Sequence, residues 1–352
     1  MPKKSYASVG KVVYIMYVNP EDCTFKSCVC GLNVNILNMK IAVLERDSVT
    51  NGDIDFSLLE NAADIDYYAR IDKDKVIETV KNYDGVIVNK TVIDRTVIDA
   101  CPKLKYIGLF ATGYNNIDID YASQKGITVC NVAGYSTDAV AQHVFSFILY
   151  VSSSLGKYID SVNSGDWKKS KSFCYYPFPI TELKGKTLGI LGYGSIGKRV
   201  AEIAKVYGMQ IIVHSRRNNG CPYEFVTKEE LFSRSDYLTV HCPLNSDTAK
   251  IVNEDTLSLM KKTAVLINTA RGGVVDEEAL ANALKNGSIY AACVDTVSIE
   301  PMQKDCALYG IDNCYITPHI AWAAKETRQR LVNIAAENIA AFLRGEPKNK
   351  VN

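Results

Sequence analysis

The sequence predicts an α/β protein with two parallel sheets, and three observations support this. The chain has 352 residues, more than one domain usually contains, which suggests two domains. Short apolar runs alternate with helix-like segments in two separate sets, a pattern typical of parallel sheets covered on both faces. The second set begins with the motif G-x-G-x-x-G, which stands between a predicted strand and a predicted helix.

Composition excludes several classes of protein. Lys and Arg number 40 and Asp and Glu 39, so no overall charge favours nucleic acid or an anionic membrane. No apolar run approaches the ~20 residues that a membrane-spanning helix needs, and the run at 11–18 lacks a signal-peptide cleavage site. Eleven scattered cysteines indicate reduced thiols and a cytoplasmic protein. Cys23, Cys28 and Cys30 lack the spacing and the histidine of a zinc site, so we expect no metal.

The first strand–helix set begins at Met39, where a short apolar run follows a stretch without clear pattern. We expect residues 1–38 to be an N-terminal extension, either a flexible tail or an artefact of an upstream start. A helix-like segment at 72–83 is one of those that separate the strands of this set. The predicted strands are 41–44, 85–88, 106–109 and 127–129.

A largely apolar segment at 136–155 follows and predicts a long buried helix between the two sets. Ser136, Thr137 and Asp138 are its candidate N-cap residues, because their side chains can accept hydrogen bonds from the first free N–H groups of a helix.

The second set ends near the C-terminus, and nothing repeats at a fixed period. Thr227 and Glu230 have the spacing of a capping box for one of its helices. The last helix, predicted over 325–345, is closed by Gly345 and Pro347. Strands are predicted in 187–191, 211–214, 236–242, 263–270, 288–297 and 314–320.

The glycine motif has the sequence context of a dinucleotide-binding turn. Gly192 allows a tight turn, Gly194 lets the backbone approach a pyrophosphate, and Gly197 lets the helix pack on the strand. The helix N-terminus, with Tyr193, Ser195 and Ile196, then offers free N–H groups and a partial positive charge. The alternative is a strand-to-helix turn that merely favours glycine. We therefore predict a Rossmann-type, doubly wound cofactor domain.

The strand after this motif ends in a basic corner. An NAD site would place an acid ~20 residues beyond the motif to bind the ribose hydroxyls. Here Ser215 stands at that place, and Arg216 and Arg217 follow. A hydroxyl beside guanidinium groups accepts a 2′-phosphate, which a carboxylate would repel. We expect NADP(H) to be preferred and NAD(H) to be accepted; the alternative is a solvated basic turn.

Three further residues follow separate strands of the same set: Arg271, Glu300 and His319. Open α/β sheets bind ligands at such strand ends. Reduction of a 2-keto acid needs a cation for the carboxylate and the carbonyl, and an acid that protonates the new alkoxide. Arg271 suits the first task and His319 the second, and a carboxylate such as Glu300 would keep the imidazole protonated. Each residue alone also has a purely structural interpretation.

The remaining histidines are weaker candidates. His143 lies in the middle of the apolar helix and is expected to be packed or at an interface. His241 follows a strand and is a candidate for lining the cofactor pocket, and His214 ends the strand before the two arginines.

In this order, "ATGYNNID", "GYGSIGK", "NTARGGVVDEEAL", "VDTVSIEP" and "TPHIAWA" resemble the D-isomer-specific 2-hydroxyacid dehydrogenases over about residues 39–345. Within that family, "GYSTDAVAQHVFSFIL" and "ITPHIAWAAKETRQRL" are most similar to the glycerate dehydrogenase (hydroxypyruvate reductase) branch. Residues 1–38 match nothing in the family, and Ser215 departs from the acid of its NAD-specific members.

The resemblance implies a domain arrangement. A Rossmann-type domain at 138–320 is inserted into a flavodoxin-like α/β substrate domain formed by 39–137 and 321–352. Members of the family are commonly dimeric, so we expect a homodimer, with the helix at 138–151 as a candidate interface.

The resemblance also implies an activity: NAD(P)H-dependent reduction of hydroxypyruvate or glyoxylate to D-glycerate or glycolate, and the reverse. It assigns catalysis to Arg271, Glu300 and His319. Backbone N–H groups of two loops, around Asn89-Lys90 and Thr112-Gly113, would hold the substrate carboxylate together with Arg271. Further cofactor contacts are expected at Cys242, Pro243, Thr248, Thr269, Ala270 and Asp295.

Four alternatives stay open at this point. Another D-2-hydroxyacid dehydrogenase activity fits the same motifs. A formate-dehydrogenase-like relative would carry glutamine where Glu300 stands. Some relatives act as cofactor-sensing co-repressors, and NADPH oxidation with hydroxypyruvate would discriminate against that role. A purely structural nucleotide-binding module leaves Arg271, Glu300 and His319 unexplained.

Overall fold

The computed structural model describes residues 4–9, 12–17, 39–218 and 220–352. Strands β1 (Lys4–Val9) and β2 (Val12–Tyr17) pair antiparallel. They belong to a unit, residues 1–38, that is separate from the unit formed by 39–352. Cys23, Cys28 and Cys30, at which we predicted no zinc site, lie outside the described residues.

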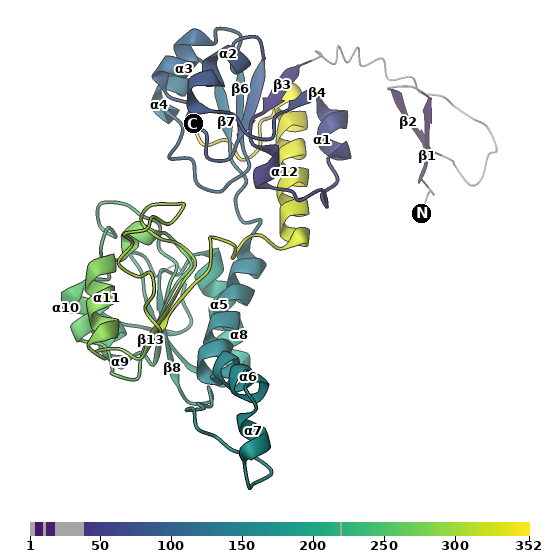
Figure 1. The fold of residues 1–352 in the computed structure, drawn as a ribbon. Helices are drawn as coiled ribbons and strands as arrows, with labels where there is room; N and C mark the ends of the chain where they lie inside the picture. The colour runs from purple at the N-terminus through teal and green to yellow at the C-terminus, as the bar shows by residue number, and fades with distance from the viewer. Residues whose placement is uncertain (1–3, 10–11, 18–38, 219) are drawn as a thin grey trace. The chain divides into compact units, whose positions relative to one another are not determined.

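A five-stranded sheet comes first in the unit that begins at Met39 (Figure 1). Its order is β4-β3-β5-β6-β7, and all neighbours are parallel. In chain order this is 2-1-3-4-5, the flavodoxin-like arrangement, so the predicted fold class is confirmed. The strands are β3 (Lys40–Val43), β4 (Asp64–Tyr67), β5 (Gly85–Val88), β6 (Tyr106–Leu109) and β7 (Thr128–Cys130). Of these, β4 was not predicted, because it is an edge strand with two aspartates and no fully buried residue.

The C-terminal helix packs on this first sheet. Figure 1 shows α12 (Lys325–Leu343), in yellow, beside α1 (Ser57–Ala62). Leu331 and Ile339 of α12 are fully buried in a core shared with β3 and β6. The last residues also return to β7, where the N–H of Val351 donates to the carbonyl oxygen of Val129 at 2.9 Å. The chain therefore leaves this sheet after β7 and comes back to it.

The other helices around the first sheet are short, each of six residues or fewer. They are η1 (Arg46–Ser48), η2 (Lys73–Lys75), α2 (Val76–Val80), α3 (Arg95–Ala100) and α4 (Ile119–Gln124).

The second sheet has seven parallel strands in the order β10-β9-β8-β11-β12-β13-β14. Counted from β8 this is 3-2-1-4-5-6-7, the doubly wound order of a dinucleotide-binding domain with one strand added. The strands are β8 (Thr187–Leu191), β9 (Gln210–His214), β10 (Glu224–Phe225), β11 (Tyr237–Val240), β12 (Val265–Asn268), β13 (Ala291–Val294) and β14 (Cys314–Ile316).

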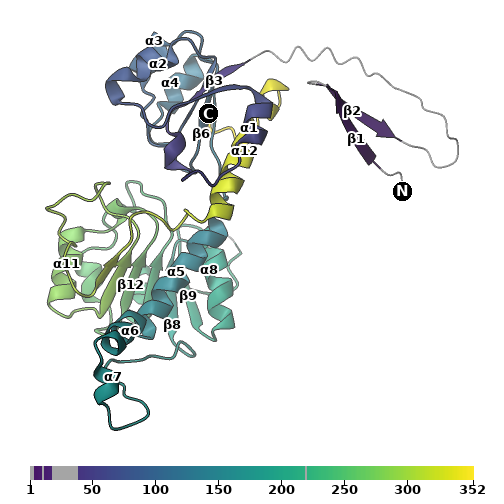
Figure 2. The same ribbon diagram turned by 45° about the vertical axis from the view of Figure 1, so that its right-hand side comes forward.

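Helices cover both faces of the second sheet (Figure 2). One apolar core joins α5 (Thr137–Ser152) and α8 (Ser195–Val206) to one face, and another joins α9 (Lys228–Arg234), α10 (Glu254–Ser258) and α11 (Glu277–Lys285) to the other. Both faces are apolar because successive side chains of a strand alternate between them. Two short helices, α6 (Leu155–Asn163) and α7 (Asp166–Lys169), extend beyond α5, and η3 spans Gly272–Val274.

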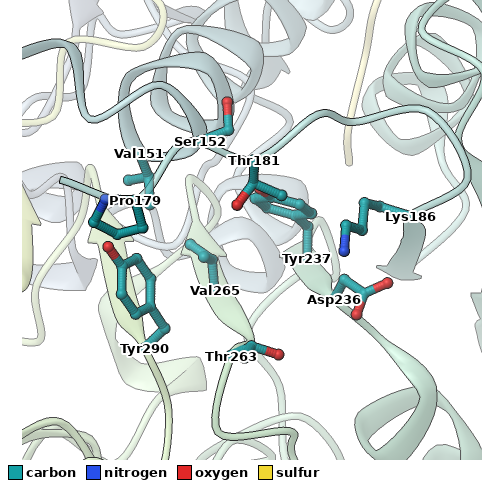
Figure 3. A pocket seen from close by; sticks show the side chains of 10 residues that line it. All are labelled: Val151, Ser152, Pro179, Thr181, Lys186, Asp236, Tyr237, Thr263, Val265 and Tyr290. Carbon is teal, nitrogen blue, oxygen red and sulfur yellow. The ribbon is translucent and has the colours of Figure 1, made fainter. Parts of the chain in front are cut away.

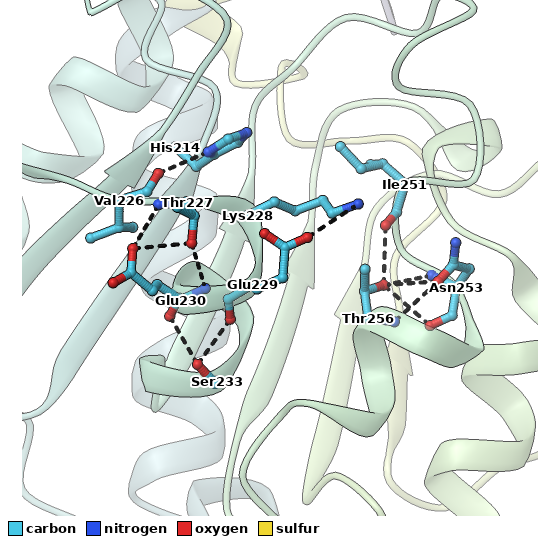
Figure 4. Close-up of polar contacts among 10 residues, drawn as sticks. All are labelled: His214, Val226, Thr227, Lys228, Glu229, Glu230, Ser233, Ile251, Asn253 and Thr256. Atoms are coloured by element: carbon cyan, nitrogen blue, oxygen red, sulfur yellow. Dashed lines mark hydrogen bonds and ion pairs between the residues drawn. The ribbon is translucent and has the colours of Figure 1, made fainter.

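The predicted capping box of α9 is present in the structure, whereas the predicted side-chain cap of α5 is not. Thr227 and Glu230 form both halves of the predicted capping box at α9, as Figure 4 shows. Ser136 takes the N-cap position of α5, but its side chain makes no cap hydrogen bond. Asp138 instead binds Arg199 of α8 at 2.8 Å, because the close packing of α5 on α8 brings that cation within reach.

Among the described helices, none is by itself long and apolar enough to cross a membrane. Helices α5 and α6 reach the required length and composition only together, and they bend by 56° where they meet.

Candidate active site

The turn after β8 has the geometry that its glycines predict. Gly192 has a φ of +98°, and a Cβ there would lie 2.6 Å from the backbone nitrogen of Cys242. A Cβ at Gly197 would lie 2.3 Å from the carbonyl oxygen of Gly192, so only glycine lets α8 approach the strand this closely. Gly194 is different: it is exposed, and no atom lies within 4 Å of where its Cβ would be.

The start of α8 offers unpaired donors beside this open space. Within the described residues, the backbone N–H groups of Ser195 and Ile196 have no acceptor, and the first backbone bond of the helix runs from Lys198 to Gly194 at 2.9 Å. A helix N-terminus also carries a partial positive charge. Space, donors and charge together fit the pyrophosphate of a dinucleotide.

The basic corner lies directly beside this turn. The N–H of Gly192 donates to the carbonyl oxygen of His214, the last residue of β9, at 2.8 Å. His214 is held in turn by a hydrogen bond between its Nδ1 and the carbonyl oxygen of Val226 at 2.9 Å, drawn in Figure 4. Arg216 and Arg217 follow; both are exposed, and neither forms an ion pair within the part of the chain that the structure describes. They are thus available to an anion bound at the turn.

Other predicted cofactor residues surround the same end of the sheet. Cys242 follows β11, and its backbone lies against Gly192. The Thr248 hydroxyl closes a turn by donating to the carbonyl oxygen of Pro243. The hydroxyl of Thr269, directly after β12, is buried and has no hydrogen-bond partner among the described residues. A buried hydroxyl without a partner is costly, and this one fits a site completed by a bound group.

Asp295 has a position that the sequence did not indicate. It is almost fully buried, and both of its carboxylate oxygens bind the loop after β14. One accepts from the Thr317 hydroxyl at 2.6 Å and from the N–H of Ile320 at 2.8 Å; the other accepts from the N–H of Ala321 at 2.8 Å. These bonds position the loop that carries His319, a role in addition to the predicted cofactor contact.

His319 and Glu300 meet as the sequence predicted. Nδ1 of His319 lies 2.8 Å from Oε2 of Glu300, although 19 residues separate them. His319 has a φ of +56°, which is unfavourable for a residue with a side chain. Asp295 and Trp322, whose Nε1 donates to the carbonyl oxygen of His319 at 2.9 Å, hold this conformation. The other ring nitrogen, Nε2, has no partner within the described residues and is free for a substrate.

Charge keeps Glu300 ionised beside this histidine. Burial works to raise the pKa of Glu300, but the hydrogen bond and the charge of His319 outweigh it. The N–H of Val297 and the ammonium of Lys90 add to the lowering, so the pKa of Glu300 lies below its usual value. The ionised carboxylate therefore orients the imidazole ring through the hydrogen bond to Nδ1.

Arg271 lies where the two sheets' loops meet. Its Nη1 donates to the carbonyl oxygen of Ala270 at 2.8 Å, and its Nη2 would be 3.0 Å from a Cβ placed on Gly113. The backbone N–H groups of Thr112 and Gly113 donate to no acceptor within the described residues. A guanidinium and free N–H groups side by side can bind a carboxylate.

The other predicted substrate loop requires a correction. The N–H groups of Asn89 and Lys90, expected to hold the substrate carboxylate, both donate to Oε2 of Glu45 at 2.8 Å, as does that of Thr91. An internal carboxylate therefore already occupies these donors. Glu45 was not predicted; the signal available for it was a charged residue two positions after the buried strand β3, at the carboxyl ends of the strands where ligands bind.

His241 and His143 are poor proton donors. Burial lowers the pKa of His241 to about 3, and its Nε2 bonds the Thr239 hydroxyl at 2.8 Å. Burial also lowers the pKa of His143, although Asp295 opposes this, and its Nε2 lies 3.1 Å from the Thr317 hydroxyl. Both are expected to be neutral near pH 7.

A pocket at the opposite edge of the second sheet lies away from these residues (Figure 3). Lys186, Asp236 and Tyr290 line it, and each directly precedes a strand. Asp236 is already paired with Lys261 at 2.8 Å. Because open parallel sheets bind ligands beyond the carboxyl ends of their strands, this pocket is not the reaction site.

Known proteins resemble the chain over the region that contains this site. The family model for the D-isomer specific 2-hydroxyacid dehydrogenase, NAD binding domain, matches residues 145–321. A hydroxypyruvate reductase of Blautia hydrogenotrophica is 38% identical over 323 residues, covering 89% of this chain and 100% of that enzyme. A glycerate dehydrogenase of Methylorubrum extorquens is 36% identical over 318 residues, covering 90% of this chain and 99% of that enzyme. Among solved structures, an acyclic imino acid reductase in complex with NADPH and D-Arg has a TM-score of 0.80 at 32% identity, covering 89% of this chain and 100% of that one.

Proposed function

The chain belongs to the D-isomer-specific 2-hydroxyacid dehydrogenase family, and from this premise we propose that it reduces hydroxypyruvate or glyoxylate to the D-2-hydroxy acid, and catalyses the reverse. The observation that carries the proposal is the pair of His319 and Glu300 at 2.8 Å, with Nε2 of the histidine free. The pair lies at the carboxyl edge of the sheet that also carries the glycine turn and Arg271. The names of the relatives, hydroxypyruvate reductase and glycerate dehydrogenase, support the same substrate class.

The residues of the chain divide the work of this reaction. Bound NAD(P)H would supply the hydride that reduces C2 of the keto acid. Arg271 binds the substrate carboxylate together with the N–H groups of Thr112 and Gly113, and its charge polarises the carbonyl. His319 gives the proton on Nε2 to the carbonyl oxygen, so that C=O becomes CH–OH. Glu300 keeps the imidazole oriented by its hydrogen bond to Nδ1.

For the cofactor we propose NADP(H) as the preferred form, with NAD(H) also accepted. Ser215 stands where an acid would bind the ribose hydroxyls of NAD, and Arg216 and Arg217 are exposed beside it. The match to an NAD binding domain and the likeness to a structure holding NADPH support a nicotinamide dinucleotide in general.

A panel of initial rates tests the function. The purified chain is assayed with hydroxypyruvate, glyoxylate, pyruvate and oxaloacetate, each with NADPH and with NADH. We expect turnover of hydroxypyruvate and glyoxylate and a lower Michaelis constant for NADPH. No oxidation of either cofactor with any acid would overturn the proposal and favour a cofactor-sensing binding protein, and a clear preference for NADH would overturn the cofactor assignment alone.

As partner we propose a second copy of the chain, and as compartment the cytoplasm. Helix α5, the predicted interface, buries most of its apolar side chains against α8, but Leu149 and Tyr150 near its end are each 39% exposed. Leu155 and Ile159 of α6 are each 51% exposed, and Trp167 of α7 is 50% exposed. Such neighbouring apolar groups are typical of an interface, and sedimentation equilibrium would measure it. The cysteines of the described residues are all free, which fits a reducing compartment.

A further inference from the structure

Glu45 fixes the loop that carries Lys90. Three consecutive N–H groups, of Asn89, Lys90 and Thr91, donate to one oxygen of its carboxylate, each at 2.8 Å. The Asn89 side chain adds a hydrogen bond from Nδ2 to the Ser48 hydroxyl at 3.0 Å. Charge-assisted bonds of this kind are the strong ones, so the backbone of this loop has one conformation.

The same loop is joined to the turn that carries the free N–H groups. Nδ2 of Asn116 donates to the carbonyl oxygen of Thr91 at 2.7 Å. Asn116 follows Thr112 and Gly113 in a single connection, between β6 and α4. The loop of Lys90 is therefore held beside the proposed carboxylate-binding turn, although 22 residues of sequence separate Lys90 from Thr112.

Lys90 belongs to a loop that hydrogen bonds tie to the carboxylate-binding turn, and its ammonium is available to a ligand. The residue is exposed, and it forms no ion pair within the described ranges. Its charge makes a small contribution to the lowered pKa of Glu300, after the larger effects of His319 and Val297. Lys90 and Arg271 thus bring two cations to the region where the loops of the two sheets meet.

A 2-keto acid with a single carboxylate needs only one of these cations. Arg271 and the N–H groups of Thr112 and Gly113 satisfy that carboxylate under the proposed function. The ammonium of Lys90 is left to a further polar group, and the position next to the carbonyl carbon, C3, is where small 2-keto acids differ. An ammonium donates hydrogen bonds to a hydroxyl and pairs with a carboxylate, and it gains nothing from a methyl group.

We propose that Lys90 is a specificity-determining residue that binds the C3 substituent of the substrate, and that Glu45 is the residue that positions it. The inference rests on the proposed function and orders its substrates: 2-keto acids with a hydroxyl or a carboxylate on C3 should be preferred to those without one. Hydroxypyruvate and oxaloacetate carry such groups; pyruvate carries a methyl group, and glyoxylate has no C3. A site built to bind a polar group discriminates strongly against analogues that lack it.

The first test compares kcat/KM for these four acids in the wild type, in Lys90→Met and in the control Lys103→Met. Lys103 is an exposed lysine of the same sheet region without an ion pair in the described residues. We expect Lys90→Met to lower kcat/KM for hydroxypyruvate by about tenfold and for oxaloacetate by more, as for loss of a hydrogen bond to a charged group. The values for glyoxylate and pyruvate should change less than about twofold, as should all four values in Lys103→Met.

The second test asks whether Glu45 acts through Lys90. We expect Glu45→Ala to reduce the ratio of kcat/KM for hydroxypyruvate to that for glyoxylate, and Glu45→Gln, which keeps an acceptor oxygen, to reduce it less. In the Glu45→Ala background, Lys90→Met should have little further effect on this ratio, because coupled residues are not additive. A purely structural role of Glu45 would lower both rates together and leave the ratio unchanged.

The possible failures are distinct. If the wild type reduces none of the acids, the proposed function fails and this inference with it. If the wild type reduces them but Lys90→Met changes the ratio of kcat/KM for hydroxypyruvate to that for glyoxylate by less than about twofold, the function stands and Lys90 does not bind the C3 substituent. Additive effects of Glu45→Ala and Lys90→Met would overturn the positioning role alone. Should Glu45→Ala fail to fold, Glu45→Gln and the Lys90 variant still decide the matter.

Discussion

The turn after β8 and the loop after β5 are alike in backbone and opposite in use. Each ends a parallel strand, and each presents neighbouring N–H groups in one place. After β8, Gly194 leaves the space open, and the N–H groups of Ser195 and Ile196 have no acceptor in the described residues. After β5, Glu45 fills the equivalent space, and three N–H groups bind its carboxylate. Strand ends of this kind become a ligand site only where the chain supplies no anion of its own.

The same contrast extends across the two sheets. At the carboxyl ends of the strands of the second sheet, several groups have no partner in the described residues: Nε2 of His319, Nη2 of Arg271 and the two arginines of the basic corner. Around the first sheet, acidic side chains form ion pairs within the chain. Asp53, for example, accepts hydrogen bonds from Arg328 of α12 at 2.8 Å. Substitutions at the groups without a partner on the second sheet should therefore alter catalysis and leave stability unchanged. Substitutions at the internal ion pairs of the first sheet should lower stability and leave catalysis unchanged.

The largest effect is expected for His319→Gln. Loss of the proton donor should lower kcat by roughly 100- to 10,000-fold, the range that a positioned general acid contributes. The affinity for NADPH, measured by fluorescence titration, should stay the same, because in the proposed mechanism Nε2 contacts the substrate and not the cofactor. An equal loss of NADPH affinity would show that His319 has a structural role.

Arg271→Lys should have the next largest effect. Lysine keeps the charge but lacks the planar fork that binds a carboxylate in two places, so we expect mainly a rise of roughly tenfold or more in the Michaelis constant for the keto acid. Steady-state kinetics with NADPH saturating would measure it. An unchanged Michaelis constant would mean that the carboxylate is bound elsewhere.

A smaller change is expected from rebuilding the basic corner. Ser215→Asp combined with Arg216→Gln and Arg217→Gln should shift the ratio of kcat/KM for NADPH to that for NADH toward NADH by about tenfold or more, because the phosphate loses charge-assisted bonds. Rates at saturating cofactor should be little changed. If the ratio does not move, the corner is a solvated basic turn.

The smallest effect on catalysis is expected at the tie between Asp53 and Arg328. The hydrogen bonds from Arg328 lower the pKa of Asp53 below its ordinary value of 3.8, against the opposing effect of burial. A lowered pKa means that the ionised form stabilises the fold, and this contribution is complete above the ordinary value and is lost as the pH falls through the lowered one. Asp53→Asn should therefore reduce Tm at pH 7 and leave kcat unchanged.

Its pH dependence provides the control. The difference in Tm between wild type and Asp53→Asn should be constant from neutral pH down to about 5 and should shrink below the ordinary value of 3.8. A difference that persists in strong acid would show that the substitution acts through packing instead of charge. A large fall in kcat at pH 7 would contradict the expectation that this ion pair stabilises the fold without affecting catalysis.

Several features could be predicted because they depend on neighbours in the chain. The strands of both sheets, the capping box of Thr227 and Glu230 and the glycine turn all follow from local periodicity and spacing. The two strands that escaped prediction, β4 and β10, are edge strands without a buried apolar run, and β10 has only two residues. Ser136 occupies the predicted N-cap position of α5, but its side chain makes no capping hydrogen bond. The packing of α5 on α8, and not the local sequence, decided its surroundings.

By itself the sequence determined the fold class, the order of the motifs and the pair of His319 and Glu300, because strand ends of a parallel sheet meet at one edge. Only the tertiary structure decided which donors remain free. Glu45 precedes Asn89 by 44 residues, and Asp295 precedes Ile320 by 25, so no local pattern reveals that one carboxylate fills a loop and the other holds one in place. Hydrogen-bond satisfaction is a property of distance in space, and adjacent parallel strands make residues neighbours that the chain itself keeps far apart.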